Sequence, residues 1–249
     1  MVDWALELAE NPNTYTPLGP NSERIVTDRY VLWMGRQPTW VSAQRFRFAE
    51  DEVDDVRAEI HSLLRERGRP SCAWEVGSHA TPANLVDQLL ERGLVDDKPT
   101  ALAVGMVLTE PPAVPPPDVE VRRVETDDEW FAAERIAAIA FEEPDVPARR
   151  PYTPDPMNPI YLAFVDGEPV ARGSASYGEH GVSLFGGSTL PEARGRGAYR
   201  ALVAARWADA AARDVPLLVT QASPMSRPIL TRLGFREVCE IRMLRDSVV

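Results

Sequence analysis

The stretch STLPEARGRGAYRALVAARWADAA, residues 188–211, has the pattern of a strand end, a turn, a glycine-containing loop and a helix. Gly195 and Gly197 permit positive φ angles and let a ligand approach the main chain without meeting a Cβ atom. A helix leaves its first four backbone N–H groups without partners inside the helix, and its dipole is positive at that end. Together with Arg194 and Arg196, these features predict a site for a phosphate or pyrophosphate group.

The segments on either side predict strands joined by tight turns, followed by alternating helix and strand. Strands are expected at three segments before the loop: 160–167, 169–178 and 182–190. A helix over 197–213 follows, then a strand over 216–223, a short helix through Leu230 and a closing strand from Phe235. This order predicts an α/β protein with a mixed, mostly antiparallel sheet flanked by helices.

Residues 110–118 read EPPAVPPPD, and five prolines in nine positions exclude both a helix and a central strand. Such a segment is typical of a linker between domains. We therefore expect a first domain at 1–110, a proline-rich linker at 111–118 and a second domain at 119–249, each near the usual domain size. Thr126 is expected to cap the first helix of the second domain, because acidic residues fill the turn after it.

The first half predicts its own alternation of strands and helices. Thr81 has the chemistry of an N-cap and Pro82 that of a first helical residue, so a helix is expected to begin there. Gly93 is expected just beyond its last turn.

Composition excludes several classes of function. The formal net charge is −11, whereas nucleic-acid binding needs a basic face, so no nucleic-acid partner is expected. No apolar run approaches the 18 residues of a membrane span, and the N-terminus has acids where a secretory signal has bases, so we expect a cytoplasmic protein without a membrane partner. Cys72 and Cys239 are expected to be reduced and buried, and no metal site is expected.

The meander, the RGRGAY loop, the helix and the closing LGF together resemble the GNAT (Gcn5-related) N-acetyltransferase superfamily, over roughly residues 119–249. The family's loop pattern is Q/R-x-x-G-x-G/A. Arg194 and Gly197 match its first and fourth positions, whereas Tyr199 stands where the family has a small residue. The LGF segment at 233–235 matches the family's LGF after its short helix.

The resemblance implies acetyl-CoA as co-substrate. In the family the loop amides hold the pyrophosphate, and the strand before the loop pairs its backbone with the pantetheine arm. Backbone N–H groups near Thr189 and Leu190, at the end of that strand, would polarise the thioester carbonyl. The cofactor-binding residues carried over in this way are Ser188, Thr189, Leu190, Arg194, Gly195, Arg196, Gly197, Ala198 and Tyr199.

The acid and base that the resemblance requires are not marked by the sequence. Many family members place a tyrosine four residues before the glycine of LGF, and Leu230 stands there. An asparagine common after the preceding strand is replaced by Ser223, a candidate for binding the cofactor arm or supplying a proton through water. Glu142 and Glu143 begin a proline-rich loop, 142–159, expected to border the acceptor cleft, and are candidates for the base. The alternative is that both are solvated acids at a helix end.

The resemblance extends faintly to the first half, which we expect to be a degenerate GNAT-like domain. Where a phosphate loop would stand, FAEDEVDD (48–55) has no glycine and five acids, which repel a pyrophosphate.

The function implied is transfer of an acetyl group from acetyl-CoA to a primary amine of a small-molecule acceptor, by direct attack on the thioester. A peptide amine as acceptor stays open, as does the oligomeric state. Because of Leu230, the alternative is a non-catalytic acyl-CoA-binding or regulatory module. A structural or interaction module applies only if CoA does not bind.

Overall fold

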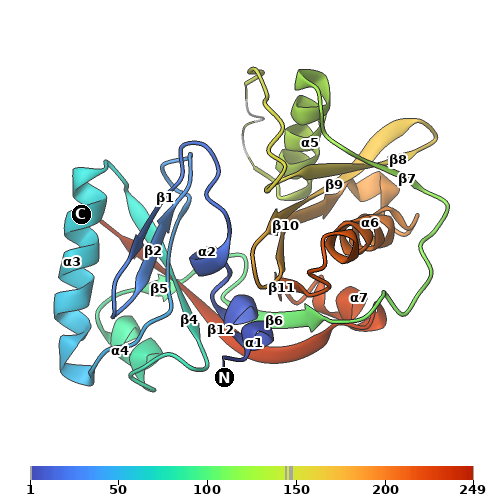
Figure 1. Ribbon diagram of the computed structural model, residues 1–249. Coiled ribbons are helices and arrows are strands. Elements are labelled where there is room, and N and C mark those ends of the chain that lie inside the picture. Colours follow the sequence, from blue (N-terminus) through green and yellow to red (C-terminus); the bar gives the residue numbers. More distant parts are fainter. Residues whose placement is uncertain (1, 144, 146–147, 249) are drawn as a thin grey trace. The chain divides into compact units, whose positions relative to one another are not determined.

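The computed structural model describes residues 2–143, 145 and 148–248, and its chain divides into two compact units (Figure 1). Unit 1 comprises Met1–Met106, Gln221–Ile229 and Glu237–Val249. Unit 2 comprises Val107–Thr220 and Leu230–Arg236. The division into folding domains at 1–110 and 119–249 stays a prediction, and it differs from these units in where it assigns the end of the chain.

Unit 1 is a mixed sheet with helices. Its helices are α1 (Trp4–Glu10), α2 (Pro12–Tyr15), a 3-10 turn (Glu50–Glu52), α3 (Val53–Glu66) and α4 (Leu85–Glu91). Its strands are β1 (Glu23–Val26), β2 (Val31–Met34), β3 (Val41–Gln44), β4 (Ser71–Gly77), β5 (Val95–Asp96), β6 (Leu102–Leu108) and β12 (Arg236–Ser247), although the last two residues of β6 and the first of β12 belong to unit 2. The strand order is β1-β2-β3-β4-β12-β6, with β3 and β4 parallel and the pairs β1–β2, β2–β3 and β4–β12 antiparallel. The C-terminal strand therefore completes the sheet of the N-terminal part of the chain.

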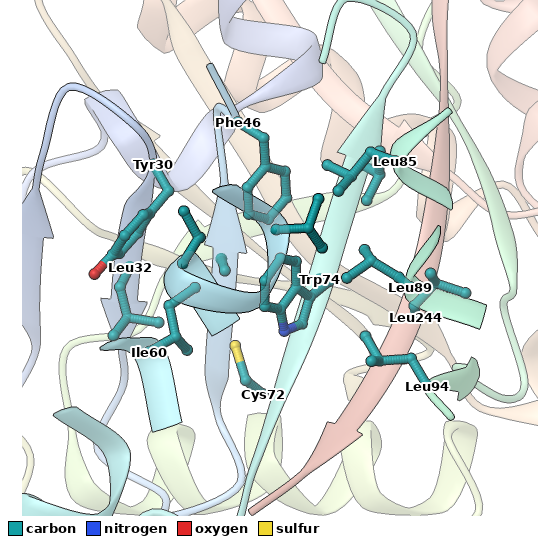
Figure 2. Packing of buried hydrophobic residues seen from close by; sticks show 14 of the residues in the cluster. Tyr30, Leu32, Phe46, Ile60, Cys72, Trp74, Leu85, Leu89, Leu94 and Leu244 are labelled. Carbon is teal, nitrogen blue, oxygen red and sulfur yellow. The ribbon is translucent and has the colours of Figure 1, made fainter. Parts of the chain in front are cut away.

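The core of unit 1 forms where α3 and α4 cover this sheet. Trp74 is fully buried at its centre, and its indole stacks on Phe46 with ring centroids 4.9 Å apart (Figure 2). Ile60 on α3 and Leu89 on α4 pack into the same cluster, because each lies on the apolar stripe of its helix.

The helix expected from Thr81 begins instead at Leu85, with Asn84 at the N-cap position. Thr81 forms an isolated bridge with Arg47: its N–H donates to Phe46 O at 3.1 Å, and its carbonyl accepts from Phe48 N at 3.4 Å. Gly93 does follow the helix end, with φ +87°.

Unit 2 contains the predicted meander. Its strands are β7 (Glu120–Arg123), β8 (Ile160–Val165), β9 (Glu168–Tyr177), β10 (Val182–Thr189) and β11 (Leu218–Ala222), whose first three residues belong to this unit. Its helices are α5 (Asp127–Ala140), a 3-10 turn (Pro191–Ala193), α6 (Ala198–Ala212) and α7 (Arg227–Arg232), which ends in this unit. The strand order is β11-β10-β9-β8-β7, antiparallel except for the parallel pair β10–β11. The prediction of mixed, mostly antiparallel sheets flanked by helices is confirmed.

Helices α5 and α6 cover opposite faces of the β8–β10 sheet. Arg172 on β9 reaches Glu134 on α5, whereas the next residue, Gly173, lies against Arg206 on α6. Because successive residues of a strand point to opposite faces, the two helices lie on opposite sides. The first turn of α5 is fixed as expected: the Thr126 hydroxyl accepts from Glu129 N at 3.2 Å.

Candidate functional site

The glycine-containing loop has the conformation that the sequence predicts. After the 3-10 turn, Gly195 and Gly197 have φ angles of +81° and +88°, which residues with a Cβ rarely adopt. Gly197 is the N-cap residue of α6, and its carbonyl accepts the first helical hydrogen bond, from Ala201 N at 3.0 Å. The loop therefore turns the chain so that the start of α6 lies beside the end of β10.

This turn leaves backbone donors available. Among the described residues, none accepts a hydrogen bond from the N–H groups of Gly195, Gly197, Ala198 or Tyr199. A Cβ atom placed on Gly195 would meet no atom within 4 Å, so the space beside this residue is open. An open space lined by unpaired N–H groups at a helix N-terminus fits a phosphate or pyrophosphate group.

The two loop arginines differ in their surroundings. Arg194 is exposed, and no described residue pairs with its guanidinium. Arg196 Nη2 pairs with Asp166 Oδ2 at 2.7 Å, at the turn between β8 and β9. Arg194 is therefore the loop cation whose full charge is available to an anionic ligand.

Strands β10 and β11 pair over a short distance and then part. Their register joins Val182 to Leu218 and Ser183 to Val219. The next carbonyl, that of Leu184, accepts a side-chain hydrogen bond from Thr220 Oγ1 at 3.2 Å instead of a backbone bond. In the described chain, the second half of β10 thus has an unpaired edge, which is available to an extended ligand.

The backbone groups on that edge follow from the pairing on the other side. Leu190 N donates to Val170 O at 2.9 Å, so this N–H is occupied within the sheet. Because backbone groups alternate between the two edges of a strand, those of Thr189 face the open edge. Of the two amides expected near a thioester, that of Thr189 is the one available.

A bulge in β10, which the sequence analysis missed, sits where the edge opens. The β9–β10 register shifts between Phe185 and Ser188, so Gly186 and Gly187 form an irregular segment, with Gly186 at φ +55°. A Cβ atom on Gly187 would lie 2.7 Å from Tyr199 Cε2, and one on Gly186 would overlap Arg172 Nη1. Two glycines inside a strand pattern were the signal for a bulge.

Tyr199 contributes to this site by packing. Its ring lies against the bulge at Gly187, and burial raises the pKa of its phenol. Its backbone N–H belongs to the loop, while its side chain supports the bulge from the α6 side. This is why a large residue stands where the loop pattern has a small one.

The catalytic candidates are not brought together by the structure. Glu142 and Glu143 are exposed at the end of α5, and Glu142 has φ +56°. Residues 144, 146 and 147 of the loop that follows lie outside the described residues. Ser223 belongs to unit 1, where its N–H donates to Ser226 Oγ at 3.1 Å. The roles of all three residues stay predictions.

Leu230 occupies a position at which a proton donor would have been expected. Its side chain is 1% exposed and packs in the core of unit 2. Gly234 has φ +97°, and Phe235 N donates to Leu230 O at 3.1 Å, so the LGF segment ends α7.

Among residues 2–143, 145 and 148–248, no cluster of three or more histidine, cysteine, aspartate or glutamate side chains is arranged to hold a metal ion. No helix in those same residues is both long and apolar enough to cross a membrane.

No family model matches the sequence, and no curated protein matches it. Solved structures do match the fold. A GCN5-related N-acetyltransferase from Kribbella flavida has a TM-score of 0.69 and 22% identity, covering 91% of this chain and 90% of its own. A tandem GNAT protein from the clavulanic acid biosynthesis pathway has a TM-score of 0.57 and 13% identity, covering 99% and 94%. A GCN5-related N-acetyltransferase from Sphaerobacter thermophilus has a TM-score of 0.56 and 16% identity, covering 90% and 82%. The resemblance to the GNAT superfamily is confirmed at the level of the fold.

Proposed function

We propose that unit 2 binds acetyl-CoA and transfers its acetyl group to a primary amine of a small-molecule acceptor. This proposal rests on the observation that two features follow one another along the chain. The open edge of β10 ends at Thr189, and the unpaired N–H groups of the loop follow within ten residues. An extended arm that ends in a pyrophosphate fits both features at once.

Each part of the co-substrate has residues suited to it. The amides of Gly195, Gly197, Ala198 and Tyr199 and the Arg194 guanidinium would hold the pyrophosphate, and the backbone of Thr189 would pair with the pantetheine arm. Acetyl-CoA supplies the acyl group as an activated thioester. The bulge at Gly186 and Gly187 would shape the space beside this group.

Direct attack by the amine is favoured because the chain offers no suitable thiol as an acyl carrier. The only cysteines are Cys72 and Cys239, both buried in unit 1. Burial raises the pKa of Cys72, and it raises the pKa of Cys239 to about 12, so both thiols stay protonated and unreactive at neutral pH. The amine nitrogen therefore bonds to the acyl carbon as the carbon–sulfur bond breaks, and the amine gives up one proton.

Thermal unfolding with saturating acetyl-CoA tests the binding step, with free CoA and ATP as controls. A ligand at about 100 times its Kd adds about 2.7 kcal/mol to the stability of the folded state. For a chain of this size that corresponds to a rise of about 2–4 °C per kcal/mol. A rise with acetyl-CoA and CoA but not with ATP supports the proposal, and no rise contradicts it.

A second candidate is a non-catalytic acyl-CoA-binding module. It is favoured by Leu230, which is buried where many family members have a tyrosine. Thiol release from acetyl-CoA, measured with and without a panel of primary amines, separates the two functions. Amine-dependent release with a matching acetylated product identifies a transferase, whereas CoA binding without release identifies a binding module.

A further inference from the structure

The face of the β9–β10 sheet that lies under α5 carries a row of buried polar side chains. Cross-strand neighbours share a face, and the register pairs Ser183 with Ser176, Phe185 with Ser174 and Ser188 with Arg172. Two of these groups have partners: Ser174 Oγ donates to Phe185 O at 3.2 Å, and Ser176 Oγ donates to Asn158 Oδ1 at 2.7 Å.

By comparison, the guanidinium of Arg172 has an unpaired nitrogen and only long hydrogen bonds. It is only 9% exposed, and its buried Nε has no hydrogen-bond partner among the described residues. Nη1 donates to Gly186 O at 3.3 Å, and Nη2 to Glu134 Oε1 at 3.5 Å, both long for charged hydrogen bonds. The Nε–Nη2 edge, which can bind a carboxylate in a bidentate manner, therefore makes only the long hydrogen bond to Glu134.

Ser188, which the β9–β10 register pairs with Arg172, also has an unpaired buried polar atom. It is 6% exposed, and its buried Oγ also lacks a partner among the described residues. No hydrogen bond joins Ser188 Oγ to the guanidinium among the described residues, although a hydroxyl can accept from one. An acceptor between the Arg172 Nε–H and the Ser188 O–H would satisfy both groups, and the positive charge of the guanidinium favours an anion.

This pair lies beside the proposed reaction centre. Arg172 Nη1 contacts the carbonyl of Gly186 within the β10 bulge, and Ser188 is the first paired residue after that bulge. Tyr152 lies in the loop that precedes β8, and the charges of Arg172 and Glu134 both act on its phenol. Tyr152 also lines a pocket of about 140 Å³, together with residues 123–125 and other residues of that loop, and neither Arg172 nor Ser188 is among its lining residues.

We propose that Arg172 and Ser188 bind the carboxylate of the acceptor, so that the natural acceptor is an amino acid or a similar small amine that bears a carboxylate. This inference rests on the transferase function proposed above. Burial lowers the pKa of Arg172, because its charge is taken out of water, and the charges of Glu134 and Glu143 offset this only in part. A carboxylate of the acceptor would compensate that cost and would orient the amine of the same molecule toward the bulge.

The test compares amino acids with their carboxamides, which differ only in the anionic group. Calorimetric titration of the full-length protein saturated with CoA would use the twenty proteinogenic amino acids together with β-alanine and γ-aminobutyrate. Each acid would be paired with its carboxamide. We expect at least one acid to bind at least tenfold more tightly than its amide, because a hydrogen bond to a charged group is lost with the carboxylate. Equal affinity in every pair, or no binding by any acid, overturns the inference.

Variants connect the preference to the residues. Arg172→Met keeps the length of the side chain and should remove the preference for the acid, and Ser188→Ala should reduce it. Arg172→Met also leaves Glu134 unpaired, so Arg172→Met/Glu134→Gln serves as a second variant in which no charge is stranded. Arg135→Met, on the exposed side of α5, is the matched control and should keep the preference. A preference that survives in both Arg172 variants refutes the assignment.

A separate readout keeps this inference distinct from the function on which it rests. Acetyl-CoA turnover with the selected acids reports on transfer, whereas the titration reports only on carboxylate recognition. Selective binding of acids without turnover would sustain the role of Arg172 and refute the transferase. Turnover of amines and amides alike, without preference for an acid, would sustain the transferase and refute the role of Arg172.

Discussion

Pro117 of the proline-rich segment packs directly against Gly197 at the start of α6. A Cβ atom on Gly197 would lie 2.8 Å from Pro117 Cγ and 3.0 Å from Pro117 Cβ. The segment that reads as a linker in the sequence thus helps to hold the loop proposed to bind the pyrophosphate. Further back along the segment, Ala113 N donates to Leu233 O at 3.0 Å.

Replacing Gly197 should therefore damage the fold as well as any ligand site. Gly197→Ala meets Pro117 and also forces a residue with a Cβ to a φ of +88°, which alone costs about 1–2 kcal/mol. Gly93→Ala is the matched control, because Gly93 has φ +87° and no atom within 4 Å of the added Cβ. Urea unfolding should show a larger loss of stability for Gly197→Ala, and equal losses would mean that Pro117 yields without cost.

Arg194→Ala should weaken acetyl-CoA binding without unfolding the protein. We expect a loss of about threefold to tenfold in affinity, since an exposed charge pair contributes about 1 kcal/mol or slightly more. The loss should shrink at high salt, because salt screens exposed charges. Arg196→Ala should have a smaller effect, since Arg196 is already paired with Asp166. Arg135→Ala should leave the affinity measured by calorimetry unchanged, and a loss as large as that of Arg194→Ala would contradict a local role.

Ionisation of the Glu75 carboxyl should lower the stability of unit 1 as the pH rises through the pKa of this group. Burial raises the pKa of this carboxyl to about 6, although Gln221 and Gln44 donate hydrogen bonds to it. Its folded pKa lies above its unfolded value, so its contribution is complete below about pH 4.4 and is lost by about pH 6, a change of about 2 kcal/mol. Because Glu75→Gln cannot ionise, its stability relative to the wild type should rise by that amount between pH 4.5 and 6.5. Glu91→Gln, an exposed substitution, should show no such rise in chemical unfolding.

Tyr161 links β8 to α6 and should control stability in alkaline solution. Its phenol donates to Asp209 Oδ2 at 2.5 Å and lies 2.7 Å from the Tyr177 hydroxyl. Burial, then these hydrogen bonds, raise the pKa of Tyr161, so its stabilising effect is present below about pH 10 and is lost as the pH rises further. Tyr161→Phe should cost about 1–2 kcal/mol at neutral pH. Its unfolding free energy should also fall less steeply above pH 10, and an unchanged slope would remove Tyr161 as the cause.

Features that depend on neighbouring residues could be predicted from the amino-acid sequence alone. The loop at 194–197 and the start of α6 were predictable because positive φ angles select glycine, and Thr126 was predictable because an N-cap and its partner lie three residues apart. The meander was predictable for the same reason, since tight turns join strands that are adjacent in the chain. These signals predicted the GNAT fold, which the solved structures confirm, and a phosphate-binding site at the loop, which stays a prediction.

Features that depend on distant partners became visible only in the folded chain. The backbone of Thr81 pairs with Phe46 and Phe48, more than thirty residues earlier, and the helix begins only at Leu85. The open edge of β10 exists because β11, approached through α6, leaves it after two residue pairs. The unpaired polar atoms of Arg172 and Ser188 depend on the β9–β10 register, on the bulge in β10 and on the position of α5 over this face. A hydrogen bond between distant residues depends on the whole path of the chain between them, and no local pattern records that path.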